Sequence, residues 1–155
     1  MATNFLHGAL GTAFNLLTTE LNSLATANGS ALGPEIDNTA AGTFWPLGRL
    51  ELLLASNSLA FTATSYVSVY LLSKDSGGNY PTYTSGASYA LASGNYLVGN
   101  IAINPKTQSA NIVYENLNNV LIPAGKFKCV LVNNTGVTLP ASGNTLNLVP
   151  TPDQY

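Results

Sequence analysis

The stretch that decides the fold reads Ile122-Pro123-Ala124-Gly125-Lys126-Phe127-Lys128-Cys129-Val130-Leu131-Val132. Side chains alternate between the two faces of a strand, so Phe127, Cys129 and Leu131 share one face. The opposite face begins with two lysines and ends with two valines. The strand is therefore amphipathic at its start and apolar on both faces at its end, which indicates that another layer covers its second half.

A turn and a second apolar segment follow this strand. Asn134 and Gly136 tolerate the positive φ of tight turns. The second segment, Thr145 to Val149, comes after a Ser142-Gly143-Asn144 corner. The pattern predicts a hairpin over Ile122 to Val149, and with it an antiparallel β protein.

The composition predicts one folded domain with a weakly charged surface. The chain has 155 residues, of which 46% are apolar and 8% are charged, against a usual charged share of about a quarter. High hydrophobicity with low charge is not typical of disorder, and 155 residues suffice for a core. The polar surface must come from Asn, Ser and Thr, which suits a protein in a crowded assembly.

Charge and hydropathy argue against nucleic acid and membrane as partners. The net charge is −2, and no basic stripe exists to neutralise phosphates. The five basic residues are scattered: Arg49, Lys74, Lys106, Lys126 and Lys128. No run approaches the ~18 apolar residues of a membrane span, and the first basic residue comes too late for a secretory signal. We expect a soluble protein made in a cytoplasm, with the single cysteine, Cys129, as a buried structural thiol.

The N-terminal segment 1–27 is expected to be an arm or a short helix attached to a β domain over 28–155. Apolar residues recur at a spacing of three and four, which marks one helical face between Leu10 and Leu24: Leu10, Ala13, Phe14, Leu17, Leu21 and Leu24. The alternative is an extended arm, because Thr18 and Thr19 are poor helix formers. Residues 1–11 form a tail that needs a partner to become ordered.

Six or seven short strands, separated by turn residues, predict an antiparallel sandwich or barrel. The expected strands before the hairpin are Leu47–Ala55, Tyr66–Leu72, Tyr96–Ile103, Ser109–Glu115 and Val120–Ile122. Alternation assigns the inward faces to Leu50, Leu52 and Leu54 in the first, Val67, Val69 and Leu71 in the second, and Leu97, Ile101 and Ile103 in the third.

Two loops carry candidate binding residues. The loop from Tyr80 to Asn95 contains Tyr80, Tyr83 and Tyr89, and exposed tyrosines bury area at low entropic cost. The alternative is that these rings fold back over the core. In the loop from Asn28 to Phe44, Glu35 and Asp37 could hold a metal ion, but their spacing fits no calcium loop, so a solvated turn is the better interpretation.

The residues needed for catalysis are not arranged for it. The only histidine, His7, lies in the N-terminal tail, so a Ser-His-Asp arrangement has no base. The seven acids are spread over turns and outward strand positions, and neither a zinc cluster nor a phosphate loop is present. We expect a protein that is not an enzyme and has no cofactor.

A set of segments resembles small virion proteins of tailed bacteriophages. The segments are Asn4-Phe5-Leu6-His7-Gly8, Thr18 to Leu24, Val69-Tyr70-Leu71-Leu72, Gly78-Asn79-Tyr80, Leu97-Val98-Gly99, Ile122 to Lys128, Asn133-Asn134-Thr135-Gly136 and Ala141 to Leu146. Some proteins of this kind are cement, or decoration, proteins that fold as jelly rolls on the capsid exterior. The resemblance extends over most of the chain, through turns and strand edges rather than a functional signature.

The resemblance implies a jelly-roll sandwich that binds the major capsid protein, and itself as a dimer or trimer, on the outside of a virion. Its mechanism would be buried area added at many identical sites. The residues expected to make these contacts are Phe5, Leu6, Phe44, Trp45, Tyr80 and Tyr83. Two alternatives remain. One is a receptor- or carbohydrate-binding module of a phage tail, with Trp45, Tyr80 and Tyr83 as an aromatic platform; the other is a head–tail connector component.

Overall fold

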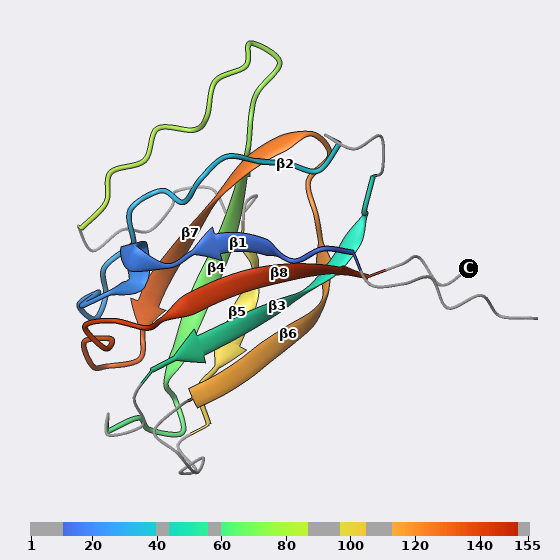
Figure 1. The fold of residues 1–155 in the computed structure, drawn as a ribbon. Coiled ribbons are helices and arrows are strands. Elements are labelled where there is room, and N and C mark those ends of the chain that lie inside the picture. Colours follow the sequence, from blue (N-terminus) through green and yellow to red (C-terminus); the bar gives the residue numbers. More distant parts are fainter. Residues whose placement is uncertain (1–10, 40–43, 56–59, 87–96, 105–112, 152–155) are drawn as a thin grey trace, which may run out of the picture.

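The computed structural model describes residues 11–39, 44–55, 60–86, 97–104 and 113–151, which form two four-stranded antiparallel sheets packed as a sandwich (Figure 1). The first sheet has the order β1-β8-β3-β6 and the second β2-β7-β4-β5. The elements in chain order are β1 (Phe14–Leu17), the 3₁₀ helix η1 (Thr19–Leu21), β2 (Ile36–Asp37), β3 (Leu47–Leu54), β4 (Tyr66–Ser73), β5 (Leu97–Ala102), β6 (Val113–Leu121), β7 (Lys126–Asn134) and β8 (Thr145–Thr151).

The strand pairing is that of a jelly roll. β1 pairs with β8, β2 with β7, β3 with β6 and β4 with β5, all antiparallel. This is the pairing of one long hairpin rolled up so that its two halves face each other as separate sheets. The predicted all-β, antiparallel sandwich is confirmed.

The core lies between the sheets and is made by the alternate residues that the sequence pattern assigns to it. Leu50, Leu52 and Leu54 of β3 are fully buried, and so are the inward residues of β4 and β7. Each buried Leu or Phe side chain contributes about 1.5–3 kcal/mol relative to an exposed one. Alternation along these three strands therefore supplies much of the driving force that brings the sheets together.

The predicted hairpin over Ile122 to Val149 is wrong, because β7 and β8 belong to different sheets. The segment between them carries the chain from one sheet across to the other. Gly136 and Gly143 adopt the positive φ of turns, at 86° and 76°. Asn134 does not turn; it is the last residue of β7.

A buried asparagine, Asn133, holds this crossover in place of ladder hydrogen bonds. Its side chain is fully buried and makes four hydrogen bonds. Nδ2 donates to the carbonyl oxygens of Leu24 and Val137 at 2.8 Å each. Oδ1 accepts from Thr135 N at 3.0 Å and Thr135 Oγ1 at 2.7 Å. Backbone groups beyond the end of a strand no longer have a neighbouring strand to bond to. The Asn133 side chain replaces that strand, because its amide donates two hydrogen bonds and accepts two.

The predicted helix between Leu10 and Leu24 does not form. Phe14–Leu17 is the edge strand β1, and only the three residues of η1 are helical. The register against β8 shifts between Asn15 and Leu17, and this irregularity lets the consecutive residues Leu16 and Leu17 both be buried. The spacing of three and four arises from that irregularity and from the short helical turn, so the extended alternative describes Phe14–Leu17.

Two further expectations were altered by bulges in the edge strands. In β5, Val69 pairs with Gly99 and Tyr70 with Leu97, so Val98 is an extra residue. Leu97 is therefore 40% exposed instead of sharing the inward face with Ile101, and Val98 packs against the core. The described end of the expected strand Ser109–Glu115 and the start of the expected strand Val120–Ile122 belong to one strand, β6, with a bulge between Leu117 and Val120. Residues 109–112 lie outside the described residues.

The second half of β7 is covered on both faces, as its sequence predicts. Val130 is fully buried, although it points away from the side that carries Cys129 and Leu131. The segment Tyr80–Gly86 crosses this outer face: Lys128 lies over the Tyr80 ring, and Gly86 N donates to Gly29 O at 3.1 Å. This segment and the chain around Gly29 form the additional layer.

Replacing Asn133 by alanine tests its role in the crossover. Asn133→Ala removes four hydrogen bonds. Leu24 O keeps its bond from Leu139 N, and Val137 O keeps its bond from Thr135 Oγ1, whereas Thr135 N loses the Asn133 side chain as its acceptor. We expect a loss of about 3 kcal/mol in the free energy of unfolding, measured with urea, because four hydrogen bonds are lost and each contributes about 0.5–1.5 kcal/mol.

The neighbouring residue is the matched control. Asn134 makes one described side-chain hydrogen bond, to Ser68 Oγ at 3.1 Å. Asn134→Ala should cost no more than about 1 kcal/mol, the usual net worth of one such bond. Equal losses for the two variants would contradict this account of the crossover.

Candidate protein interface

One end of the sandwich brings together segments that are far apart in the sequence. Gly11 N donates to Pro150 O at 3.2 Å, and Ile122 N donates to Pro46 O at 2.9 Å. Leu47, the first residue of β3, pairs with Leu121 on one side and Thr151 on the other. The beginning and the end of the described chain therefore lie at the end of the sandwich where β3 starts and β6 finishes (Figure 1).

A second buried asparagine, Asn38, fixes the backbone at this end. Its Nδ2 donates to Trp45 O at 2.9 Å and to Pro123 O at 3.2 Å, and its Oδ1 accepts from Trp45 N at 3.4 Å. Asn38 is 2% exposed. The segment before β3 and the crossover from β6 to β7 are thus held together, and Trp45 packs half-buried against the core.

Exposed apolar side chains are concentrated at the same end. Of the five large apolar side chains that are exposed in the described part of the chain, three lie here: Phe44 at 49%, Leu97 at 40% and Leu121 at 72%. The other two, Tyr66 and Tyr114, lie at the opposite ends of their strands. Leu121 is the most exposed of all. Exposed apolar groups that lie at one end of a domain make that end a candidate contact surface.

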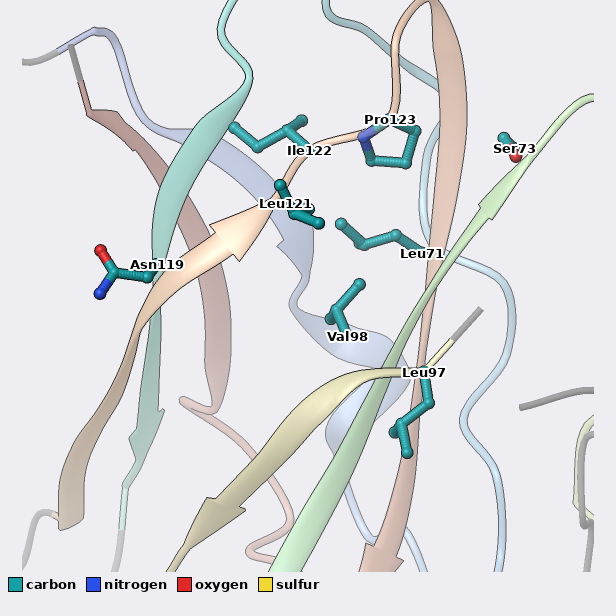
Figure 2. A pocket seen from close by; sticks show the side chains of 8 residues that line it. All are labelled: Leu71, Ser73, Leu97, Val98, Asn119, Leu121, Ile122 and Pro123. Atoms are coloured by element: carbon teal, nitrogen blue, oxygen red, sulfur yellow. The ribbon is translucent and has the colours of Figure 1, made fainter. Parts of the chain in front are cut away.

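A cavity of about 380 Å³ opens between the two sheets beside Leu121. Figure 2 shows Leu71 of β4, Val98 of β5 and Leu121 of β6 pointing toward one another around it. Ile122 and Pro123 close it on the side of the crossover, and Ser73 lies at its rim. Polar and apolar groups therefore contribute about equally to its exposed walls.

The cavity lies where both edge strands bulge. Val98 is the extra residue of β5, and Asn119, whose φ is +58°, belongs to the bulge of β6. Both residues line the cavity. Bulges bend a strand and break its pairing, so these two irregularities separate the sheets at a level where regular strands would leave no space.

In the described part of the tyrosine loop, Tyr80–Gly86, the two tyrosines contact the second sheet and the segment before β2. The Tyr80 hydroxyl donates to Glu35 Oε2 at 2.9 Å, and the Tyr83 hydroxyl donates to Ser30 O at 2.6 Å. The Tyr80 ring also lies between two ammonium groups, with Lys74 Nζ 5.1 Å and Lys128 Nζ 5.0 Å from its centroid. Tyr80 and Tyr83 are half-buried, and their hydroxyl groups bind the loop to Glu35 and Ser30.

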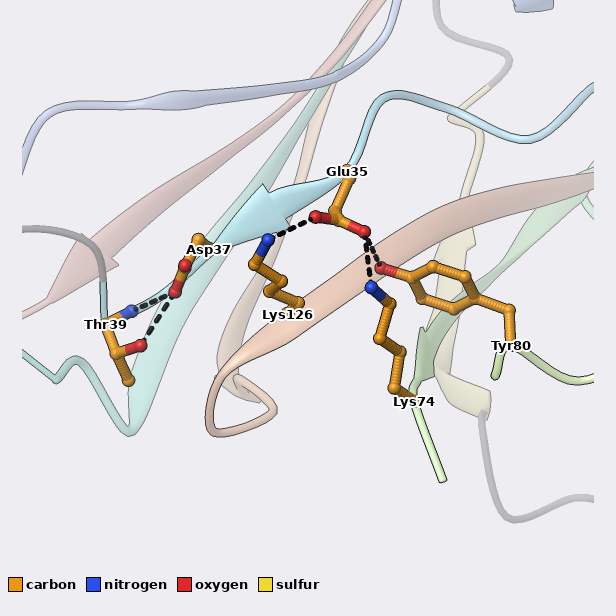
Figure 3. Close-up of polar contacts among 6 residues, drawn as sticks. All are labelled: Glu35, Asp37, Thr39, Lys74, Tyr80 and Lys126. Carbon is orange, nitrogen blue, oxygen red and sulfur yellow. Dashed lines mark hydrogen bonds and ion pairs between the residues drawn. The ribbon is translucent and has the colours of Figure 1, made fainter. Parts of the chain in front are cut away.

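Glu35 is the centre of this cluster (Figure 3). Its carboxylate accepts from Lys126 Nζ at 2.8 Å and Lys74 Nζ at 2.9 Å in addition to Tyr80. These hydrogen bonds, that of Lys126 first, lower the pKa of Glu35 to about 2. Burial and the Glu35 carboxylate together raise the pKa of Tyr80 to about 12. Three of the chain's five basic residues thus contact Glu35 or Tyr80.

Glu35 and Asp37, the two carboxylates considered as metal ligands, bind different partners. Glu35 faces the lysines, whereas Asp37 Oδ1 accepts from Thr39 N at 2.9 Å and Thr39 Oγ1 at 2.7 Å. These hydrogen bonds lower the pKa of Asp37. Figure 3 shows the two groups engaged in separate contacts, as in the solvated turn that we prefer from the sequence.

The structure brings some of the predicted contact residues together and separates others. Phe44 and Trp45 lie at the apolar end, but Trp45 is fastened to Asn38, Tyr80 to Glu35 and Tyr83 to Ser30. Each of the three aromatic residues thus has a hydrogen-bond partner of its own. Phe5 and Leu6 lie outside the described residues, as does Tyr89.

The sequence pattern does not identify Leu97 and Leu121 as contact residues. Leu97 was assigned to the core because strict alternation places it with Ile101. Leu121 was placed in a separate short segment. The residues at these two bulges are of types that also occur in regular strands, so the sequence does not reveal the bulges. The exposure of Leu97 and Leu121 follows from the bulges.

Comparisons with family models, curated proteins and solved structures give no match for this chain. Within the described ranges, no helix combines the length and the hydropathy that crossing a membrane requires.

The Glu35 cluster should make stability depend on pH in acid. The folded pKa of about 2 lies below the ordinary value of 4.5. The stabilisation is therefore complete above about pH 5, and is lost as the pH falls toward about 2. Urea unfolding of the wild type and of Glu35→Gln should differ most at neutral pH, and the difference should shrink steadily below the ordinary pKa. A difference that stays constant from neutral pH down to about pH 2 would contradict the ion-pair account.

Proposed function

We propose that this protein is a structural virion protein, a capsid cement or decoration protein, and that it binds the major capsid protein through the end that carries Phe44, Leu97 and Leu121. The observation that carries the proposal is the concentration of exposed apolar side chains there. The resemblance of its turn and strand segments to virion proteins of tailed phages supports a location in a phage particle. The proposal does not rest on the fold alone, because one fold serves many functions.

The physical mechanism is the burial of a small apolar surface at many identical sites. Covering one exposed leucine or phenylalanine contributes about 1.5–3 kcal/mol. A ligand that binds the assembled shell better than the dispersed subunits shifts the equilibrium toward the shell. With only 8% charged residues, copies crowded on one particle repel each other weakly. No catalytic step is part of this function.

The rigidity of the apolar end supports such a role. Asn38 fixes the backbone on both sides of the exposed residues through Trp45 and Pro123. Since these backbone segments are already ordered, binding does not incur the cost of ordering them. Self-association as a dimer or trimer on the particle belongs to the same proposal, and the protein would reside on the capsid exterior after synthesis in the host cytoplasm.

Binding to capsids that lack the protein tests the proposal. Leu121→Asp places a charge in the centre of the proposed contact, and we expect it to weaken binding by about tenfold or more, the usual effect of altering a central contact residue. Tyr114→Asp is the matched control, because Tyr114 is exposed on the same strand at the opposite end. It should bind like the wild type.

Particles reconstituted with these variants give a second measurement. Wild-type protein and Tyr114→Asp should restore resistance to heat and osmotic shock, and Leu121→Asp should restore less. If both variants bind equally well, the proposed surface is wrong. If depleted particles keep their DNA and fail only at adsorption to the host, the cement function is wrong and a receptor-binding role replaces it.

A further inference from the structure

The outer face of β4 carries two tyrosines with a serine between them. Tyr66, Ser68 and Tyr70 share this face because side chains alternate along a strand, while Val67 and Val69 point into the core. Tyr66 is 38% exposed and Tyr70 is half-buried. The Cα atoms of the two tyrosines are roughly 13 Å apart, since a strand rises about 3.3 Å per residue.

Ser68 orients an asparagine on each side of this strand. Its Oγ donates to Asn100 Oδ1 on β5 at 2.8 Å and accepts from Asn134 Nδ2 on β7 at 3.1 Å. Among the described residues, neither Asn100 Nδ2 nor Asn134 Oδ1 has a hydrogen bond. Each amide is thus fixed at one end, and its other end is available as a donor on Asn100 and as an acceptor on Asn134. Together with the two tyrosines, these three residues form the β4 patch.

The β4 patch contains no charged side chain. Along the same face of these strands, the first charged residue is Lys128, which pairs with Leu72 and lies over the Tyr80 ring. A surface without charge gains nothing from an ionic ligand, and it cannot neutralise the phosphates of a nucleic acid. A fitting ligand is therefore neutral, with apolar surface for the rings and hydroxyl groups for the amides.

An oligosaccharide combines these properties. Each pyranose ring has a face of C–H groups that packs against an aromatic ring, and an edge of hydroxyl groups that donate and accept hydrogen bonds. Tyrosine suits such packing because it offers a large, rigid surface at a low cost in conformational entropy. The separation of the two tyrosines exceeds the width of one sugar ring, so a chain of several units is needed to reach both.

We propose that the β4 patch binds a neutral oligosaccharide, with Tyr66 and Tyr70 packed against sugar rings and with Asn100 and Asn134 bonded to hydroxyl groups. The orienting bonds from Ser68 lower the entropic cost of binding, because the amides are already fixed. This activity goes beyond the proposed capsid contact and does not rest on it. Tyr66 pairs with Asn134 at the end of β7, whereas the apolar end lies where β7 starts.

Titration of the full-length protein with defined oligosaccharides, followed by NMR of the backbone amides, tests the proposal. The probes are linear hexasaccharides of glucose, of galactose and of N-acetylglucosamine, each added up to millimolar concentration. We expect at least one of them to shift the amide signals of Tyr66, Ser68 and Asn100. A hexasaccharide of galacturonic acid is the charged control, and it should bind at least tenfold more weakly than that neutral probe.

Two variants with matched controls assign the binding to the patch. Asn100→Asp keeps the oxygen that accepts from Ser68 but replaces the free donor by an acceptor. Tyr66→Ala removes one ring. Each should weaken binding about tenfold or more. The controls Asn116→Asp and Tyr114→Ala change exposed residues of the same types on β6, in the other sheet, and should bind like the wild type.

Four results would overturn the proposal. These are no shift in the patch with any neutral probe, equal binding of the galacturonic acid probe, binding that survives both Asn100→Asp and Tyr66→Ala, or a dimer in sedimentation that Tyr66→Ala dissociates. The last result would assign the patch to a second copy of the chain. Circular dichroism verifies that each variant is folded. Capsid binding by Tyr66→Ala should equal that of the wild type, so the two proposals fail separately.

Discussion

Buried amides at the crossovers between the sheets are the constraint on which this jelly roll depends. A chain that passes from one sheet to the other leaves both ladders, so its backbone groups need other partners in a place without water. Asn133 and Asn144 hold the two ends of the β7–β8 crossover, where Asn144 donates to Pro140 O at 2.8 Å and accepts from Ala55 N at 3.3 Å. Asn38 does the same between Trp45 and Pro123. The apolar core drives the sheets together, and these amides satisfy backbone groups where the chain passes between the sheets.

The same constraint shapes the end that we propose as an interface. Asn38 holds the crossovers on either side of the cavity, while bulges in β5 and β6 hold the sheets apart. Leu121 lines this cavity and is exposed, and Phe44 is exposed at the same end of the sandwich. The opposite pattern holds over the outer face of β7, where Glu35, Tyr80 and three lysines fasten a loop onto the sheet. One surface of the molecule is thus closed by its own chain, and another is left with apolar groups in solvent.

The sequence predicted what depends on alternation and missed what depends on irregularity. The inward faces of β3, β4 and β7 follow from a period of two, and so does the covering of Val130. The β7–β8 connection was mistaken for a hairpin because Gly136 signals a turn but not whether the chain returns to the same sheet. Leu16 and Leu17 suggested a helix because a bulge buries neighbours that regular strand geometry would separate. Leu97 and Leu121 could not be recognised as contact residues, since their exposure is set by bulges that involve ordinary residues such as Val98 and Asn119.

Hydrogen exchange at the backbone amide of Thr135 tests most directly whether the buried amides hold the crossovers. Thr135 lies just beyond the end of β7, and its N–H is bonded to the Asn133 side chain instead of to a neighbouring strand. The account predicts that this amide exchanges only when the whole domain unfolds, with the same opening free energy as the core amides of β7. Exchange as rapid as that of the exposed loop residue Thr138, in a protein whose β7 amides stay protected, would contradict it.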